Sequence, residues 1–322
     1  MRFHPLIRLT LTAALALAAP LVAAQAWPAK PVRLVLQFPP GGSTDAVARI
    51  LAQSMSAALG QSVIVENRPG ADGAIAGDHV ARAEPDGYTF FMASNTPMMQ
   101  VPLLKKNPPY DPVKSFTPVV LVGRYVYVLV VNPALPVKDV AELLAHARNN
   151  PGRLAYGSYS GVTQLMYSRI KSVARVDMTL VNYKGEGPTI VDLLGGHVQL
   201  TFATPLSTLA HIREGKLRAL ATLLPARSNL LPNVPTGAEA GLPPFAAGTW
   251  AALFGPPKLS PDIVSRMNRE VNAAIARADV RDKIEKLGFD LAGSTPEEMA
   301  AFLQDQLSAW GRAFREAGMN PE

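Results

Sequence analysis

A short stretch rich in glycine and hydroxyl side chains, near the start of the chain, has the composition of an anion site. Gly41-Gly42 is followed by Ser43, Thr44 and Asp45, and then by apolar residues at helical spacing. Residues without a Cβ let the backbone approach a small molecule closely. The first N–H groups of a helix are unpaired, and its dipole is positive there. We therefore expect Ser43 or Thr44 to cap this helix, and a carboxylate to bind its N-terminus without a basic side chain.

Asp45 admits two interpretations. In the first turn of a helix, a carboxylate offsets the helix dipole unaided. It could instead meet the ammonium group of an amino-acid ligand. We favour the first, because it requires nothing external. For the stretch as a whole, the alternative to ligand binding is that its polar side chains only cap their own helix.

A second polar stretch lies between an expected strand and an expected helix. It reads Gly-Ser-Tyr-Ser-Gly-Val-Thr at 157–163, and its candidate ligand contacts are Ser158, Ser160, Gly161 and Thr163. If it faces the first stretch across a cleft, two helix N-termini could hold both ends of a dicarboxylate. It is not a nucleophile elbow, because that motif needs Ser in the middle and Tyr159 stands there.

Two further groups of candidates come after expected strands. Ser94, Asn95 and Thr96 form the first group. Loops at the carboxyl ends of parallel strands are where open α/β sheets bind ligands. Tyr183 and Gly185 form the second group, in which the tyrosine could supply an apolar wall or a hydrogen-bond donor. A simple polar turn is the alternative for each.

The elements that must position these residues alternate between strands and helices. Val32 to Leu36 is typical of a buried strand, a helix follows and ends at Gly60, and Val63 to Val65 is the next strand. This βαβ opening predicts an α/β fold. The other expected strands cover 88–92, 119–122, 127–131, 178–181, 198–202 and 218–222, and the other expected helices cover about 137–148, 163–173 and 187–194.

Two strong helix-start signals lie in the last part of the chain. Ser260 is an expected N-cap with Pro261 after it, and Thr295 opens a capping box. The apolar stripe that follows, as far as Phe314, indicates packing against a core, with partner docking as the less favoured interpretation. The proline-rich passage at 230–244 excludes regular structure.

The first 26 residues have the pattern of an export signal. Arg2 and Arg8 precede an uncharged apolar run, and a small-x-small pattern ends at Ala26. The run is shorter than the roughly 20 residues that span a bilayer. We expect cleavage after about Ala26 and a periplasmic mature protein; an uncleaved anchor is the alternative.

Composition excludes several classes of function. The chain has no cysteine, so disulfides, thiolate zinc sites and cysteine nucleophiles are excluded. Its basic residues are scattered, which argues against a nucleic-acid partner. The sequence has no metal-ligand spacing of histidines, no P-loop and no dinucleotide fingerprint, so we expect no metal, no cofactor and no enzyme activity. A hydrolase is the distant alternative, because catalytic triads need not be local in sequence.

A series of short motifs resembles those of the Bug receptors, the solute-binding components of tripartite tricarboxylate transporters. The first motif spans 38–45 and includes Pro40. The second and third lie at 66–71 and 85–89. Further matches lie at 156–158, 183–185, 193–196, 215–221 and 232–236. The resemblance extends over essentially the whole mature chain, and the serial order of the motifs carries it.

This resemblance implies a two-lobed periplasmic binding protein fold of the type II kind, each lobe a mixed, mostly parallel sheet flanked by helices. Lobe 1 would comprise 27–125 and 250–322, and lobe 2 would comprise 126–249, joined by crossing strands. The resemblance further implies a monomer that binds a small carboxylate and hands it to membrane permease subunits. A sensor that presents its ligand to a membrane histidine kinase is the alternative.

Two departures from the family pattern bear on the ligand. Met166 stands where relatives carry His, and Ala203 and Thr204 stand where they often carry a carboxylate beside the cleft. Losing that carboxylate should weaken selection for an α-amino group. We therefore expect a dicarboxylate or an aromatic acid rather than an amino acid, with Ala203 and Thr204 among the contacts.

Overall fold

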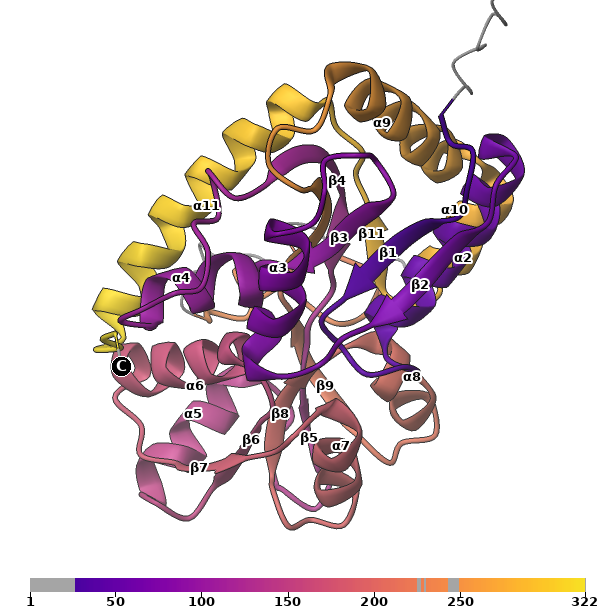
Figure 1. Ribbon diagram of the computed structural model, residues 1–322. Helices are drawn as coiled ribbons and strands as arrows, with labels where there is room; N and C mark the ends of the chain where they lie inside the picture. Colours follow the sequence, from indigo (N-terminus) through magenta and orange to yellow (C-terminus); the bar gives the residue numbers. More distant parts are fainter. Residues whose placement is uncertain (1–26, 225–226, 229, 243–248, 322) are drawn as a thin grey trace, which may run out of the picture.

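The computed structural model describes residues 27–321, except 225–226, 229 and 243–248. The expected export signal lies outside these residues. The described chain forms two lobes, each with its own sheet and flanking helices (Figure 1). Among the described helices, none is both long enough and apolar enough to cross a membrane.

The first sheet has six strands in the order β11-β4-β10-β3-β1-β2. They are β1 (Val32–Leu36), β2 (Val63–Asn67), β3 (Thr89–Ser94), β4 (Thr117–Tyr125), β10 (Trp250–Gly255) and β11 (Phe289–Leu291). β1 pairs in parallel with both β2 and β3, while β10 is antiparallel to β3 and β4. The parallel pairing brings the polar loops that follow β1 and β3 to the same edge of the sheet.

The second sheet has five strands in the order β7-β6-β8-β5-β9. They are β5 (Val128–Val131), β6 (Ala155–Ser158), β7 (Thr179–Asn182), β8 (Leu200–Ala203) and β9 (Arg218–Thr222). β6 pairs in parallel with β7 and β8, and β5 is antiparallel to β8 and β9. The α/β class is confirmed, but neither sheet is mostly parallel, because β4, β5 and β10, which flank the crossings between lobes, all pair antiparallel.

The helices cover both lobes. They are α2 (Ser43–Leu59), α3 (Ala74–Ala81), α4 (Val101–Leu104), α5 (Val140–Asn149), α6 (Gly161–Ala174), α7 (Glu186–Leu194), α8 (Pro205–Arg213), α9 (Pro261–Ala276), α10 (Ala278–Glu285) and α11 (Pro296–Glu316), with short helical turns η1 (Ala71–Gly73) and η2 (Thr96–Gln100). The expected helix boundaries hold at Gly60, which is left-handed, and at the caps Ser260 and Thr295. Helices α3, α8 and α10 were not expected, because each buries few large apolar side chains.

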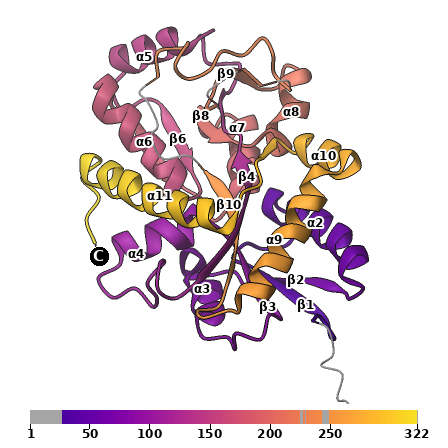
Figure 2. The ribbon, with the colours of Figure 1, turned by 90° about the horizontal axis from the view of Figure 1, so that it is seen from above.

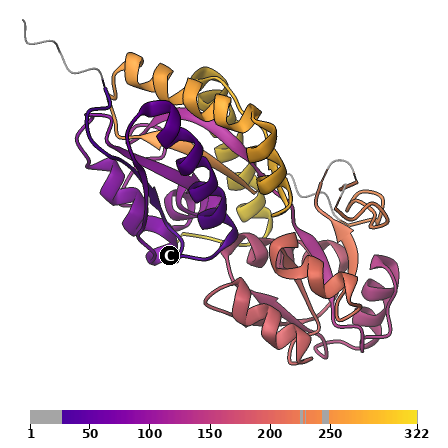
Figure 3. The same cartoon turned by 90° about the vertical axis from the view of Figure 1, so that its right-hand side faces the viewer.

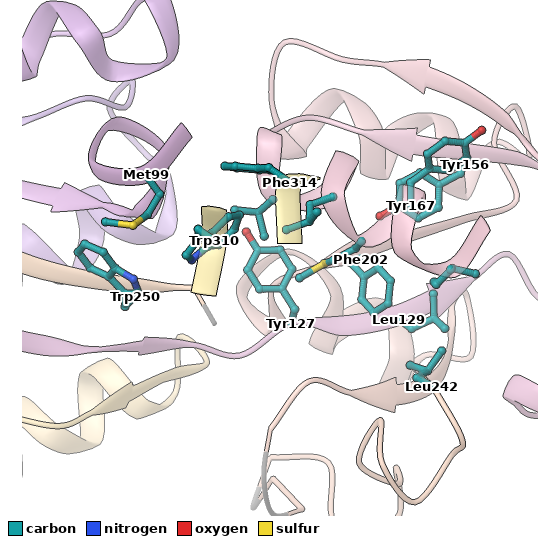
Figure 4. Packing of buried hydrophobic residues seen from close by; sticks show 14 of the residues in the cluster. Met99, Tyr127, Leu129, Tyr156, Tyr167, Phe202, Leu242, Trp250, Trp310 and Phe314 are labelled. Carbon is teal, nitrogen blue, oxygen red and sulfur yellow. The ribbon is translucent and has the colours of Figure 1, made fainter. Parts of the chain in front are cut away.

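The apolar stripe of α11 packs into a core, as expected. Leu303, Trp310 and Phe314 are at most 2% exposed. They belong to one cluster that also includes Tyr127 and Phe202, so the cluster extends from the first sheet into the second (Figure 4). The end of α11 lies between α4 and α6 in Figures 1 and 2. Helix α11 therefore contributes to the packing of one lobe against the other.

The two lobes, which lie side by side in Figure 3, are joined where the chain crosses between them. The N–H of Tyr125 donates to the carbonyl of Thr249 at 3.0 Å, and the Thr249 hydroxyl donates to the carbonyl of Tyr125 at 3.2 Å. The next N–H, that of Val126, donates to the carbonyl of Gly288 at 3.0 Å. Three chain segments therefore meet at this junction.

Gly288 provides a test of this junction. Its φ is +75°, and a Cβ placed there would lie 2.4 Å from Cγ of Pro205, at the start of α8. We expect Gly288→Ala to lower the free energy of unfolding by about 2–4 kcal/mol, since overpacking adds to backbone strain. Gly215→Ala is the matched control, with φ +71° and no atom within 4 Å, and should cost about 1 kcal/mol. Equal losses in thermal melting would contradict the contact with Pro205.

Candidate functional site

The start of α2 in the first lobe meets the start of α8 in the second. Oγ of Ser43 lies 3.3 Å from Oγ1 of Thr204. Oγ1 of Thr44 lies 2.5 Å from the hydroxyl of Tyr125, which belongs to the junction between lobes. The structure thus brings together Ser43 and Thr204, two sequence-predicted residues that are far apart in the chain.

The N-terminus of α2 differs from the expected cap. The N-cap is Gly42, with φ −83° and no side-chain hydrogen bond, so neither Ser43 nor Thr44 fills that role. Both hydroxyls turn instead to partners outside the helix. A Cβ added at Gly41 or Gly42 would meet no atom within 4 Å, and Pro40 is exposed. The backbone just before α2 therefore leaves space beside the start of the helix.

Asp45 is committed to partners within its own lobe. Its carboxylate accepts hydrogen bonds from the Gly41 N–H at 3.0 Å, Arg49 Nε at 2.9 Å and Asn67 Nδ2 at 2.9 Å. Burial alone would raise the pKa of Asp45, but the hydrogen bonds from Arg49, Gly41 and Asn67 outweigh it and lower that pKa. This geometry favours a structural role for Asp45 over binding of a ligand ammonium.

The stretch at 157–163 forms the start of α6. Ser160 is the N-cap and shares a capping box with Thr163, whose Oγ1 accepts from the Ser160 N–H at 3.0 Å. Ser158 Oγ lies 3.1 Å from Thr163 Oγ1. Ser158 and Thr163 are fully buried, so their hydroxyls serve this local network. Ser160 is only partly buried, and it and the first N–H groups of α6 are the parts of the stretch best suited to a ligand.

A residue of the first lobe lies against the start of α6. A Cβ added at Gly161 would fall 1.6 Å from Oε1 of Gln100, at the end of η2. Within the described part of the chain, this buried Oε1 has no hydrogen-bond partner. Gly161 is therefore needed for the close approach of the lobes, and Gln100 is a site residue that sequence reasoning missed. No motif pointed to it.

The loop after β3 holds another polar group without a partner. Ser94 Oγ lies 2.7 Å from the side-chain amide of Gln37, so its hydroxyl is used internally. Asn95 is 3% exposed, and its Nδ2 has no partner among the described residues. Thr96 begins η2 and is buried. Because buried polar groups are normally paired, Asn95 is the residue of this loop with an unused donor.

The candidates after β7 and β8 have different surroundings. The Tyr183 hydroxyl donates to Asp192 at 2.7 Å, and burial together with this contact raises the pKa of Tyr183 to about 12. Its donor is thus already used, although its ring can still form a wall. Gly185 is the N-cap of α7 and has no close neighbour. Ala203 is wholly buried at the end of β8.

Glu186 is the most important site residue that sequence reasoning did not identify. Its Oε1 accepts from the Thr204 N–H at 2.5 Å and from Ser207 Oγ at 2.6 Å, and its Oε2 accepts from Thr204 Oγ1 at 3.2 Å. Burial raises its pKa, and hydrogen bonds from Ser207 and Thr204 offset part of that rise. The feature of the sequence that could have indicated Glu186 is its position, a carboxylate directly after Gly185 in a loop between a strand and a helix.

Two tyrosines lie close to Glu186. Burial raises the pKa of both Tyr127 and Tyr159, and the nearby charge of Glu186 raises it further, so both hydroxyls stay protonated at neutral pH. The Tyr159 hydroxyl is enclosed and faces Glu186, whose pKa it lowers.

Two further features of the described chain bear on this site. No group of three or more His, Cys, Asp or Glu residues in that part of the chain could hold a metal ion. A cavity of about 800 Å³ lies between the lobes at Gln100 and Gln164, and Lys105 and Lys106 contribute to its lining.

The chain matches known proteins over most of its length. Residues 47–319 match the family described as tripartite tricarboxylate transporter family receptor. Protein BugT of Bordetella pertussis is 38% identical over 308 residues, which cover 94% of this chain and 93% of BugT.

Solved structures of similar proteins include two with bound acids. An R. palustris protein solved with adipate has a TM-score of 0.85 and 32% identity, covering 92% of this chain and 100% of that one. MatC of Rhodopseudomonas palustris, solved with malate, has a TM-score of 0.79 and 32% identity, covering 89% and 99%.

These similarities confirm the resemblance drawn from the motifs and the two-lobed fold. The family and its solved members are solute-binding receptors, which confirms that the chain is not an enzyme. The chain belongs to the receptor family of the tripartite tricarboxylate transporters, the family that includes the Bug proteins.

Proposed function

We propose that this chain is a periplasmic receptor that captures a small carboxylate between its lobes. It acts as a monomer and delivers the ligand to the membrane permease subunits of a tripartite tricarboxylate transporter. The observation that carries the proposal is the meeting of Ser43 and Thr204 across the lobes. This contact places the open N-terminus of α2 beside the second lobe, where an anion can bind unpaired N–H groups.

An unused donor supports anion capture. Asn95 Nδ2 is buried with no partner among the described residues, and it can donate to a carboxylate oxygen. The basic residue at the start of α2, Arg49, is already paired with Asp45. The ligand carboxylate is therefore bound by helix N-termini, hydroxyls and amides instead of by basic side chains. The adipate and malate bound by similar proteins fit the same ligand class.

The ligand we propose is a dicarboxylate or an aromatic acid rather than an amino acid. An α-amino group needs a carboxylate with free acceptor capacity. Asp45 is occupied by Gly41, Arg49 and Asn67. Glu186 accepts three hydrogen bonds from Thr204 and Ser207 and also faces the Tyr159 hydroxyl, which together fill its roughly four acceptor sites. Ala203 and Thr204 supply no carboxylate of their own.

The division of the chain into lobes follows the sheets. We place lobe 1 at 27–125 and 250–322, and lobe 2 at 126–249. In support, every strand of the first sheet lies in the first set and every strand of the second sheet in the second set. We further propose that the export signal is removed after about Ala26.

Binding of the ligand carboxylate at the start of α2 is tested by placing a negatively charged side chain of the protein at that helix end. Gly42→Asp and Gly42→Asn should both fold, because either side chain can cap the helix and its Cβ meets no atom. The aspartate, however, repels a ligand carboxylate from the same N–H groups. In calorimetric titrations with adipate, malate and benzoate, we expect Gly42→Asp to bind at least tenfold more weakly than Gly42→Asn.

Two outcomes would contradict the proposal. One is equal affinity of the two Gly42 variants for the acids that bind. The other is a wild-type melting temperature raised by aspartate or glutamate but by none of the three acids, since a ligand at 100 times its Kd adds about 2.7 kcal/mol to stability. The second outcome would overturn the preference against amino acids.

Asp45 gives a separate test with a pH signature. Its lowered folded-state pKa means that its stabilisation is present above the ordinary value of 3.8 and is lost as the pH falls through the folded-state value. Asp45→Asn should lower the free energy of unfolding by about 1–3 kcal/mol at pH 7, and by progressively less below pH 3.8.

The matched control for Asp45 is Asp279→Asn, which removes an exposed carboxylate that also pairs with an arginine. We expect almost no change from it, because exposed ion pairs contribute little. Thermal melting of both variants at pH 7 and pH 3 is the measurement. An Asp45→Asn protein as stable as wild type, yet with lost binding, would show that Asp45 serves the ligand instead.

A further inference from the structure

A carboxylate of the protein itself lies at the N-terminus of α8. Thr204 is the N-cap of α8, and Ser207 is in its first turn. Glu186, from the start of α7, accepts from the Thr204 N–H, the Thr204 hydroxyl and the Ser207 hydroxyl. These are the donors that an anion at this helix end would use. The N-terminus of α8 is therefore already bound to a resident anion.

No cation accompanies this carboxylate in the described structure. The groups that set its pKa are burial and hydrogen bonds from Ser207, Thr204 and Tyr159, with no Lys, Arg or His among them. The titratable groups that face it from other elements are Tyr127 and Tyr159. On its own side, Lys184 is exposed and Asp192 is held by Tyr183. The charge of Glu186 is therefore stabilised by dipoles alone.

Glu186 is adjacent to the proposed ligand position. Thr204 Oγ1 lies 3.2 Å from Glu186 Oε2 and 3.3 Å from Ser43 Oγ, in the first turn of α2. One hydroxyl thus separates the resident carboxylate from the start of α2, where we place the ligand carboxylate. A second ligand carboxylate on the α8 side would meet a like charge with no cation between them, which is unfavourable in a partly buried setting.

Two aromatic side chains are among the neighbours of Glu186. Tyr127 is 8% exposed, and Tyr159 is partly buried. Their rings offer apolar surface. Such a wall suits an uncharged, apolar ligand body.

We propose that Glu186 is a specificity-determining residue that restricts the receptor to monocarboxylates with an uncharged apolar or aromatic body. The inference rests on the proposed capture of a carboxylate between the lobes. Of the two ligand classes proposed above, it keeps the aromatic acids that carry one carboxylate and excludes the dicarboxylates. The single carboxylate binds at the start of α2, and Glu186 excludes a second one by occupying the donors of α8.

Matched acids that differ by one carboxylate test this inference. Benzoate is compared with terephthalate, and hexanoate with adipate, by calorimetric titration at pH 7.5, where all four are ionised. The wild-type receptor should bind each monocarboxylate at least tenfold more tightly than its dicarboxylate partner. This comparison needs no variant, so it stands even if a variant fails to fold.

The variant Glu186→Gln then tests the effect of the negative charge of Glu186 alone. Glutamine keeps the shape of the side chain, its oxygen can accept from Thr204 and Ser207, and its NH2 group can donate to the Thr204 hydroxyl. We expect the preference for monocarboxylates to shrink at least tenfold. Glu285→Gln, which makes the same charge change at an exposed ion pair on α10, should leave the preference unchanged.

The outcomes separate this inference from the proposed function. If the wild type binds terephthalate or adipate as tightly as the matched monocarboxylate, or if folded Glu186→Gln keeps the full preference, the role of Glu186 is refuted while carboxylate capture stands. If none of the four acids binds either protein, both the role of Glu186 and the proposed capture fail.

Discussion

The backbone contacts where the chain crosses between its lobes fix the geometry on which the site depends. Tyr125 and Thr249 are hydrogen-bonded to each other, and Val126 is bonded to Gly288. This junction also reaches the site directly, because the Tyr125 hydroxyl contacts Thr44 in the first turn of α2. Relative motion of the lobes must act through these segments. The junction also reaches the start of α8, because Gly288 lies against Pro205. A ligand that contacts both lobes would therefore be linked to the junction through Tyr125 and Gly288.

The chemistry of the site follows from how its charges are used. Asp45 and Arg49 neutralise each other within the first lobe, and Glu186 is held by dipoles in the second. What remains for a ligand is a set of neutral donors, some of them buried and unpaired, such as Asn95 Nδ2. Neutral donors at the N-termini of helices can bind a carboxylate. Dissociation of the carboxylate from such donors costs less free energy than breaking a desolvated ion pair.

Local sequence signals predicted the frame of the molecule well. The first strand has the expected bounds, Gly60 ends α2 in the left-handed conformation, and Ser260 and Thr295 cap their helices. Each of these depends on residues within a few positions of one another, so the sequence carries the information directly. The same is true of the polar loops after β1, β3 and β6, which the alternation of elements places at strand ends.

Features that depend on contacts between distant parts of the chain could not be predicted in this way. Thr44 has the sequence position of a cap but bonds Tyr125, 81 residues away. Glu186 bonds Thr204 and Ser207 within the second lobe, and Gln100 lies against Gly161 only once both lobes are assembled. Nothing in the local pattern around Glu186 indicates that its partners begin the following helix. The family resemblance supplied the lobes but not these side-chain contacts.

The most direct test of the central claim is a crystal structure of the receptor with the acid that binds most tightly in the titrations. We predict a ligand carboxylate within about 3 Å of the first N–H groups of α2, with the ligand also touching residues 160–161 of the second lobe. An acid bound instead in the cavity beside Lys105 and Lys106, with the start of α2 untouched, would contradict the account.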